Sequence, residues 1–362
     1  MEQKRLGDIA TYINGYAFKP EDRGSTGLPI IRIQDLTGNA YDLGFYDGKY
    51  PEKIEINDGD VLISWSASLG VYIWNRGKGL LNQHIFKVVF DKCEVNKQYF
   101  VFAVKYKLKE MELKTHGATM KHIVKKDFDN TVIPFPTVEK QADIAYILSK
   151  IESIVEFRQQ ELQQLDDLIK ARFVEMFGDM YLNSKGWPEA KLESMADVVS
   201  GITKGRKTKA EDLTEVPYMA VSNVKDGYID WTTVKTIEAT QQEIEQYRLL
   251  ADDVLMTEGG DPDKVGRGAI IKEPLENCIH QNHIFRVRLD ESMILPEFFA
   301  EYLQHQRSKR YFLGCAKQTT GIASINMTQL RALPVLMSPL PKQEEFVLFK
   351  AQVNKSKLKK LR

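Results

Sequence analysis

Three short clusters in the sequence combine residues that could bind phosphate or metal, but none forms a complete catalytic signature. Gly77-Lys78-Gly79 and Gly266-Arg267-Gly268 resemble fragments of phosphate-binding loops, yet neither has the strand–glycine–helix context of such a loop. His280 and His283 lack cysteine or acidic residues at zinc-ligand spacing. There is no GxxxxGK(S/T) loop and no NPPY-like or DPPY-like adenine-methylation motif. The sequence therefore indicates no catalysis and no cofactor or metal bound by this chain.

The composition is that of a globular protein without a strong overall charge. The 362 residues suggest two or three domains, and 50 basic residues balance 50 acidic ones. Cys93, Cys278 and Cys315 lie far apart and lack paired metal spacing, which is typical of a reducing cytosol. No apolar run approaches about 18 residues and no signal-peptide core is present. We expect a soluble cytoplasmic protein that does not associate with membranes.

A long helix is predicted from Thr137 to Gly178, in the middle of the chain. Pro134 and Pro136 precede this segment, which contains neither proline nor glycine before Gly178. Apolar residues recur every seven positions, which is the pattern of a coiled coil. One column reads Leu148, Val155, Leu162, Ile169, Met176, and the second reads Ile144, Ile151, Arg158, Leu165, Arg172. Such a helix would be about 60 Å long and needs a partner helix.

The sequence on either side of this helix is repeated. Asp60-Val61-Leu62-Ile63-Ser64 corresponds to Asp253-Val254-Leu255-Met256-Thr257, and Gly15 corresponds to Gly201. Lys140-Gln141 in the helix likewise matches Lys342-Gln343. The predicted domains are residues 1–136 and 181–338, with helices at 137–180 and 339–362. A helix–helix interface is expected from Ile144, Leu148, Ile151, Val155, Leu162, Leu165 and Ile169 of the first helix and Phe346, Phe349 and Val353 of the second.

This arrangement resembles the specificity (S) subunit of type I restriction–modification enzymes. The resemblance rests on Ile133–Gln141, where the first helix begins, on Ala171–Asp179, where it ends, and on the openings Leu6-Gly7-Asp8-Ile9 and Leu192–Gly201. It also rests on Gly117-Ala118-Thr119 and Gly321-Ile322-Ala323 upstream of each helix. The resemblance covers essentially the whole chain, and only the second helix, which is about half as long as the first, departs from it.

The resemblance implies a mixed α/β fold with two target recognition domains and two long antiparallel helices, related by a pseudo-twofold axis. Each domain would read one half of a bipartite site in double-stranded DNA, and the helices would set the spacing between the halves. The helices would also dock two methylation (M) subunits, and restriction/motor (R) subunits would join them. S-adenosylmethionine, ATP and Mg would then belong to the partners.

Residues for DNA contact are sought among cations for phosphates and polar side chains for base edges. The candidates are Tyr16, Lys19, Arg32, Gln34, Ser64, Trp65 and Lys121 in the first repeat, and Lys204, Arg206, Lys207, Ser222, Asn223, Lys264, Arg267, Lys317 and Gln318 in the second. Trp65 would either stack on a base or fill a half-buried core position. The basic segment from Lys204 to Lys209 would either contact phosphate or be a solvated surface.

Two alternatives stay open from the sequence. A duplicated coiled-coil scaffold that binds protein partners would suit the central helix, because residues 137–180 contain nine acidic and five basic residues. Arg158 and Arg172, in a heptad column, would either pair with acids across the helix interface or extend their charged ends into water. Basic, glycine-containing loops at the same place in both repeats favour DNA over the scaffold.

Overall fold

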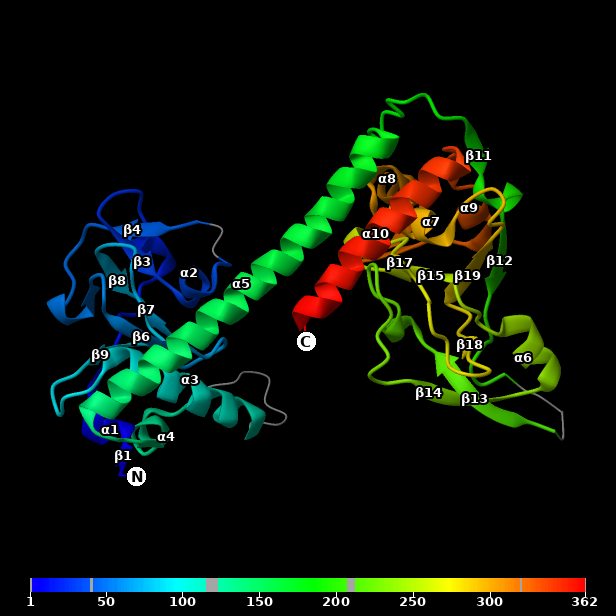
Figure 1. The fold of residues 1–362 in the computed structure, drawn as a ribbon. Coiled ribbons are helices and arrows are strands. Elements are labelled where there is room, and N and C mark those ends of the chain that lie inside the picture. Colours follow the sequence, from blue (N-terminus) through cyan, green and yellow to red (C-terminus); the bar gives the residue numbers. More distant parts are fainter. Residues whose placement is uncertain (1, 40–41, 115–122, 207–211, 320, 362) are drawn as a thin grey trace. The chain divides into compact units, whose positions relative to one another are not determined.

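A computed structural model describes residues 2–39, 42–114, 123–206, 212–319 and 321–361 (Figure 1). The chain forms two compact units, Met1–Phe157 and Arg158–Arg362. A single continuous helix, α5 (Val138–Phe177), passes from the first unit into the second. The helix predicted from Thr137 to Gly178 is therefore confirmed, and Gly178 ends it with a φ of 81°, a conformation that glycine adopts without strain.

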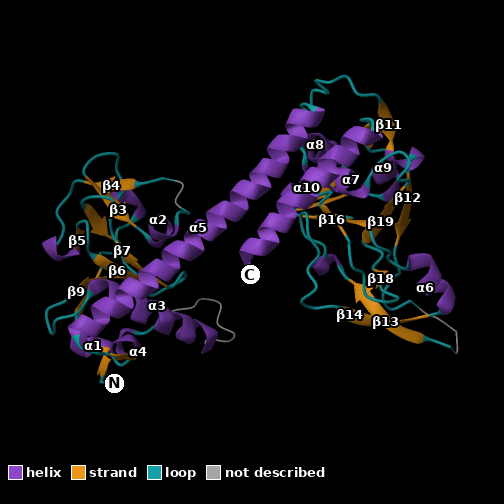
Figure 2. Cartoon of the chain, viewed as in Figure 1, coloured by secondary structure: helices purple, strands orange, loops and turns teal. Residues whose placement is uncertain are grey.

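Unit 1 contains two four-stranded sheets (Figure 2). In the first sheet every neighbouring pair is antiparallel, and its order is β2 (Thr11–Asn14), β9 (Ile85–Val89), β6 (Val61–Ser64), β7 (Gly70–Ile73). The second has the order β4 (Gly44–Tyr46), β3 (Leu28–Ile31), β8 (Gly79–Leu81), β5 (Glu55–Ile56), and β3 pairs with β8 in parallel. Unit 1 also contains β1 (Gln3–Arg5) paired with β10 (Val132–Pro134), and the α-helices α1 (Leu6–Ile9), α2 (Ile33–Thr37), α3 (Lys97–Lys114) and α4 (Lys125–Asp129).

Unit 2 repeats this plan. Its antiparallel sheet has the order β12 (Ala196–Ser200), β19 (Ile284–Leu289), β15 (Val254–Thr257), β17 (Gly268–Ile270). A second sheet has the order β14 (Lys235–Ala239), β13 (Thr214–Met219), β18 (Ile279–His280), again with one parallel pair. The remaining strands are β11 (Glu189–Lys191) paired with β22 (Pro334–Leu336), and a sheet of β16 (Gly259–Gly260), β21 (Ile322–Ser324) and β20 (Lys317–Thr319). The helices are α6 (Gln241–Tyr247), α7 (Pro296–Gln304), α8 (Gln306–Cys315), α9 (Met327–Arg331) and α10 (Leu340–Leu361).

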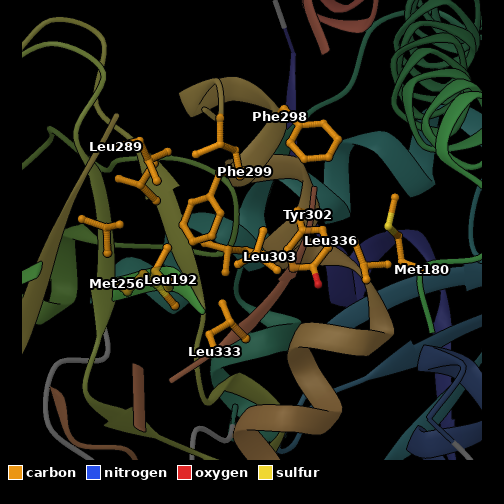
Figure 3. Packing of buried hydrophobic residues seen from close by; sticks show 14 of the residues in the cluster. Met180, Leu192, Met256, Leu289, Phe298, Phe299, Tyr302, Leu303, Leu333 and Leu336 are labelled. Carbon is orange, nitrogen blue, oxygen red and sulfur yellow. The ribbon is translucent and has the colours of Figure 1, made fainter. Parts of the chain in front are cut away.

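One inner strand of each four-stranded antiparallel sheet, β6 in unit 1 and β15 in unit 2, is buried on both faces. This burial explains the run of apolar residues in each strand. Val61 and Ile63 of β6 enter one core cluster of unit 1, whereas Leu62 enters the other. In β15, Met256 enters the main cluster of unit 2 and Leu255 a separate one. Successive side chains of a strand point to opposite faces, so such a strand needs apolar residues throughout. The main cluster also receives Phe298, Phe299 and Tyr302 from α7 (Figure 3).

A buried glutamine near the start of each long helix ties that helix to its own unit. The Gln141 side chain accepts a hydrogen bond from the backbone N–H of Asn96 at 2.9 Å and donates to the carbonyl of Pro136. Gln343 does the same with the N–H of Leu295, at 2.9 Å, and the carbonyl of Ser338. The match between Lys140-Gln141 and Lys342-Gln343 therefore reflects one structural role, used twice.

Replacing Gln343 by alanine is expected to lower the free energy of unfolding of unit 2 by about 1–3 kcal/mol, because two buried backbone groups lose their partner. Urea unfolding followed by circular dichroism measures this change. Gln352, exposed on the same helix, supplies the control. If Gln343→Ala costs no more than Gln352→Ala, the glutamine does not anchor the helix.

Within unit 2, α10 packs antiparallel to the C-terminal part of α5. The ring of Phe173 lies edge-on to Phe346, with 5.1 Å between centroids. Arg172 pairs with Glu345 at 2.7 Å, and Asp166, earlier in α5, pairs with Lys357, later in α10. The two helices therefore run in opposite directions. At this end of α5 the structure brings the residues of the predicted interface together, because Leu165, Ile169, Phe346, Phe349 and Val353 all belong to or pack against one core cluster.

The N-terminal part of α5 differs from the heptad prediction. The side chains of Leu148, Ile151 and Val155 are 36%, 51% and 48% exposed, and Ile144 and Leu162 are half-buried. The expected helix–helix seam therefore does not cover Leu148, Ile151 and Val155 in the described structure. The reason is that a heptad pattern defines an apolar face but not the length of helix that covers it.

The two arginines of the heptad column take different roles. Arg172 pairs across the interface with Glu345 and within α5 with Glu175, and hydrogen bonding to Glu175 is the main reason that its pKa is raised. Arg158 pairs with Glu161 of its own helix at 2.9 Å. Pairing across the helices thus holds for Arg172, whereas Arg158, whose side chain is 53% exposed, follows the solvated alternative.

Candidate nucleic-acid interface

The loops that begin at Gly15 and Gly201 follow equivalent strands, β2 in unit 1 and β12 in unit 2. The N–H of Tyr16 donates to the carbonyl of Leu81 at 2.8 Å, and that of Ile202 donates to the carbonyl of His280 at 2.8 Å. A Cβ on Gly15 would lie 2.0 Å from the nearest carbonyl oxygen, and so would one on Gly201. Only glycine permits this approach of two backbones. Beyond these glycines, the side chains of Tyr16, Lys19 and Lys204 are exposed.

A second part of the candidate surface in unit 2 joins segments that are distant in sequence. The backbone of β16 pairs with β21, with Gly259 opposite Ser324, and the N–H of Ile325 donates to the carbonyl of Glu258 at 2.8 Å. These contacts place the loop at 258–264 beside the hairpin at 317–324, so the predicted Lys264, Lys317 and Gln318 share one region. All three side chains are exposed, and Lys264 also pairs with Asp261.

Unit 1 has a hydrogen bond equivalent to the one between Ile325 and Glu258 in unit 2, because the N–H of Ile123 donates to the carbonyl of Trp65 at 2.9 Å. Trp65 is half-buried and stacks on Phe86 with 5.6 Å between centroids, and its indole N–H donates to Asn14. It therefore fills the partly buried core position that the sequence left open. Lys121 and Lys207 lie outside the described residues.

Four predicted contact residues have structural roles within their own unit. Arg32 is 8% exposed and pairs with Asp35, and it donates to the carbonyl of Asp42. Ser64 is fully buried, and its hydroxyl donates to the carbonyl of Ser68. These bonds hold both side chains inside unit 1, so we do not keep either as a candidate for base reading.

The other two lie in unit 2. Arg206 forms a bidentate pair with Glu243, which lowers the pKa of that carboxyl to about 2 through hydrogen bonding. Asn223, 3% exposed, donates to the carbonyls of Asp230 and Thr233. Both side chains are thus engaged within the unit, and neither is kept as a DNA contact.

Asn223 also shows how the two units match. Its side-chain oxygen accepts from the N–H of Ala220 at 3.0 Å, as the carboxylate of Asp35 accepts from the N–H of Arg32 at 2.8 Å. The residue before each of these, Gln34 and Ser222, is exposed. Gln34 and Ser222 therefore occupy equivalent exposed positions and remain candidates for contacts to base edges.

Two residues of the interface region were not predicted from the sequence. Ile322, in the same hairpin as Lys317, is 56% exposed, and Arg310 lies beside a small hollow lined by Pro262 and Val265 near Lys264. Gly321, with a φ of 81°, marks the hairpin turn and is the signal that could have drawn attention to Ile322. Arg267, a predicted contact, is half-buried, and its Nε has no hydrogen-bond partner among the described residues.

The region shows no sign of metal chemistry in the part of the chain that the structure describes, where no three histidine, cysteine or acidic side chains gather in a metal-binding group. Burial lowers the pKa of His280 to about 4, so its imidazole is neutral at physiological pH and lies against the carbonyl of Tyr247. Across the described residues, no helix is long and apolar enough to cross a bilayer.

The chain matches the family model "Type I restriction modification DNA specificity domain" twice, over residues 1–167 and 184–360. The chain belongs to this family. The double match coincides with the duplicated strand order and with the repeated glutamine anchor. The chain is thus a specificity subunit of a type I restriction–modification system, its DNA-recognition and not its catalytic component, as the resemblance in the sequence indicated.

Relatives support the assignment over most of the chain. The EcoBI specificity subunit of Escherichia coli is 22% identical over 94% of this chain and 77% of its own length. The MjaVIII specificity subunit of Methanocaldococcus jannaschii is 24% identical over 85% of this chain and 76% of its own length. The S subunit structure from M. genitalium superposes with a TM-score of 0.54 at 14% identity, covering 99% of this chain and 90% of that one. The predicted mixed fold of two repeated domains with a long helix is confirmed.

Proposed function

We propose that each unit of this specificity subunit reads one half of a bipartite DNA site. The observation that supports this most directly is that the loops after Gly15 and Gly201 leave equivalent places in the two units and expose Tyr16, Lys19 and Lys204. Two copies of one surface, with different side chains, suit the reading of two different half-sites. The proposed recognition domains are residues 1–136 and 181–338, with helices at 137–180 and 339–362 between and after them.

The proposal extends to partners and to the role of the helices. The long helix α5 would set the spacing between the two half-sites, and two M subunits would dock on the helices, with R subunits completing the complex. S-adenosylmethionine and ATP would be bound by those partners. The duplicated-scaffold alternative is less well supported, because exposed cations recur beside the loops and hairpin described above.

Methylation mapping tests the proposal. The chain would be expressed with its M subunit in a host that lacks adenine methylation, and the genome would be sequenced for modified adenines. We expect a single asymmetric bipartite motif, and a chain in which residues 1–130 are replaced by those of a relative should change only one half of it. If a complex forms on a sizing column but no adenine is modified, the scaffold alternative gains support.

Removing the charge of Lys317 should weaken DNA binding without changing sequence preference. Lys317→Ala is expected to reduce the slope of log K against log salt concentration by about 1, as the loss of one phosphate contact does. Fluorescence anisotropy at several salt concentrations measures the slope for the chain in complex with its M subunits. Lys355→Ala, which removes an exposed lysine from α10, is the matched control. Equal slopes for the two variants would exclude Lys317 from the phosphate contacts.

A further inference from the structure

The hairpin of β20 and β21 lies at the same end of unit 2 as the loop after Gly201. In the antiparallel sheet, β12 ends at Ser200 and β15 ends at Thr257, both opposite the start of β19. After one further residue β15 is followed by β16, which pairs with β21. The hairpin therefore belongs to the surface that contacts DNA under the proposed function.

The two faces of this hairpin have different surroundings. Residues directly opposite each other in an antiparallel pair point to the same face, and successive residues alternate between the faces. Gln318 lies opposite Ala323, which is fully buried, and its side-chain amide donates to the carbonyl of Leu313 in α8 at 3.2 Å. This inner face is thus turned towards unit 2. The outer face carries Lys317, Thr319 and Ile322.

Thr319 and Ile322 form the apolar part of the outer face. They lie directly opposite each other and both are exposed, Ile322 to 56%. The hydroxyl of Thr319 donates to the carbonyl of Ile322 at 3.4 Å. Because its own hairpin engages this hydroxyl, the methyl group of Thr319 is left beside the branched side chain of Ile322. The two residues together present a small patch of methyl groups next to the charge of Lys317.

The hairpin is held in place at both of its ends. At the end of β21, the N–H of Ile325 donates to the carbonyl of Glu258 at 2.8 Å. Before the start of β20, the side-chain amide of Gln329 donates to the carbonyl of Cys315. These bonds fix the position of the outer face, as a contact that discriminates between bases requires.

We propose that Thr319 and Ile322 read the 5-methyl group of a thymine in the half-site that unit 2 recognises. This inference rests on the proposed function, because it assigns a role to two residues of the proposed DNA surface. The major groove admits a two-stranded β-ribbon, and the thymine methyl is the apolar group on the base edges there. The minor-groove edges offer only hydrogen-bond donors and acceptors. Lys317, on the same outer face, lies where it can bind a neighbouring phosphate.

The paired arrangement favours a contact to a base edge over insertion between bases. Apolar wedges that enter the base stack are single projecting side chains. Thr319 and Ile322 instead lie side by side on one face of a ribbon, and their methyl groups form a shared surface. Such a surface is suited to packing against one methyl group.

The test uses the full chain in complex with its M subunits and DNA duplexes that carry the site found by methylation mapping. Each thymine in the half-site of unit 2 is replaced in turn by deoxyuridine, which lacks only the methyl group. We expect one replacement to weaken binding about fourfold in fluorescence anisotropy, as the loss of one buried methyl group does. In the variant that combines Thr319→Ser and Ile322→Ala, the thymine and uracil duplexes should bind equally.

Leu275→Ala is the matched control. Leu275 is 45% exposed and follows β17, which runs antiparallel to β15, so it lies at the opposite end of the sheet. This variant should keep the difference between the thymine and uracil duplexes. Circular dichroism should show both variants folded, because all the changed side chains are exposed.

Three outcomes would overturn the assignment. The first is a half-site for unit 2 that contains no T·A pair, and the second is a set of deoxyuridine duplexes that all bind like the parent duplex. The third is a folded variant with Thr319→Ser and Ile322→Ala that still prefers thymine, since other residues would then read the methyl group. Failure of the proposed function is a different result, namely the absence of any bipartite motif with the parent chain, and the assignment would fall with it.

Discussion

Replacing Phe173 by alanine is expected to lower the free energy of unfolding of unit 2 by about 3–5 kcal/mol. The ring is fully buried and contacts Phe177, Phe298 and Phe346 at centroid distances between 4.8 and 5.4 Å. Its loss would remove apolar burial and leave a cavity where α5, α7 and α10 meet, and rigid helices close such a cavity only in part. Both α5 and α10 would then lose the aromatic contact through which they pack on each other.

Urea unfolding followed by circular dichroism would measure this effect. Phe157→Ala is the matched control, because Phe157 lies on the same helix and is 68% exposed, so its truncation should change stability by less than about 0.5 kcal/mol. A difference between the two variants below about 1 kcal/mol would show that the aromatic cluster does not hold α5 to unit 2.

The second large effect is expected from Gly201→Ala. A Cβ at this position would lie 2.0 Å from the carbonyl oxygen of His280 and 2.7 Å from that of Gln281. Both atoms belong to the backbone, so the strand itself must move. We expect a loss of at least about 3 kcal/mol, the upper end of the usual cost of overpacking. Moving the backbone at this position would also displace the loop on which Lys204 lies.

Thermal and urea unfolding of Gly201→Ala should be compared with Gly314→Ala. A Cβ on Gly314 meets no heavy atom within 4 Å, and this residue lies in α8, where alanine is favoured over glycine by about 0.5–1 kcal/mol. The two substitutions should therefore change stability in opposite directions. If Gly201→Ala is as stable as the parent chain, the close approach of the two backbones does not require glycine.

The long helix and the repeat could be predicted from the sequence because both depend on local patterns. Apolar periodicity without proline or glycine defines α5, and matched motifs such as Asp60–Ser64 and Asp253–Thr257 mark equivalent strands. The individual contact residues could not be predicted as well. Arg206 and Glu243 are 37 residues apart, and nothing in the local sequence shows that they pair. A basic residue in a loop is compatible with binding a phosphate and equally with holding its own domain together.

The central part of α5 has a consequence for how new specificities arise. Residues 153–160, which span the boundary between the two units, all have exposed side chains, so this stretch of helix belongs to the packed core of neither unit. A genetic crossover within it would join the first part of one gene to the second part of another without breaking a packed core. Under the proposed function, recombination at this point would exchange one recognition unit at a time and generate new combinations of half-sites from existing folded parts.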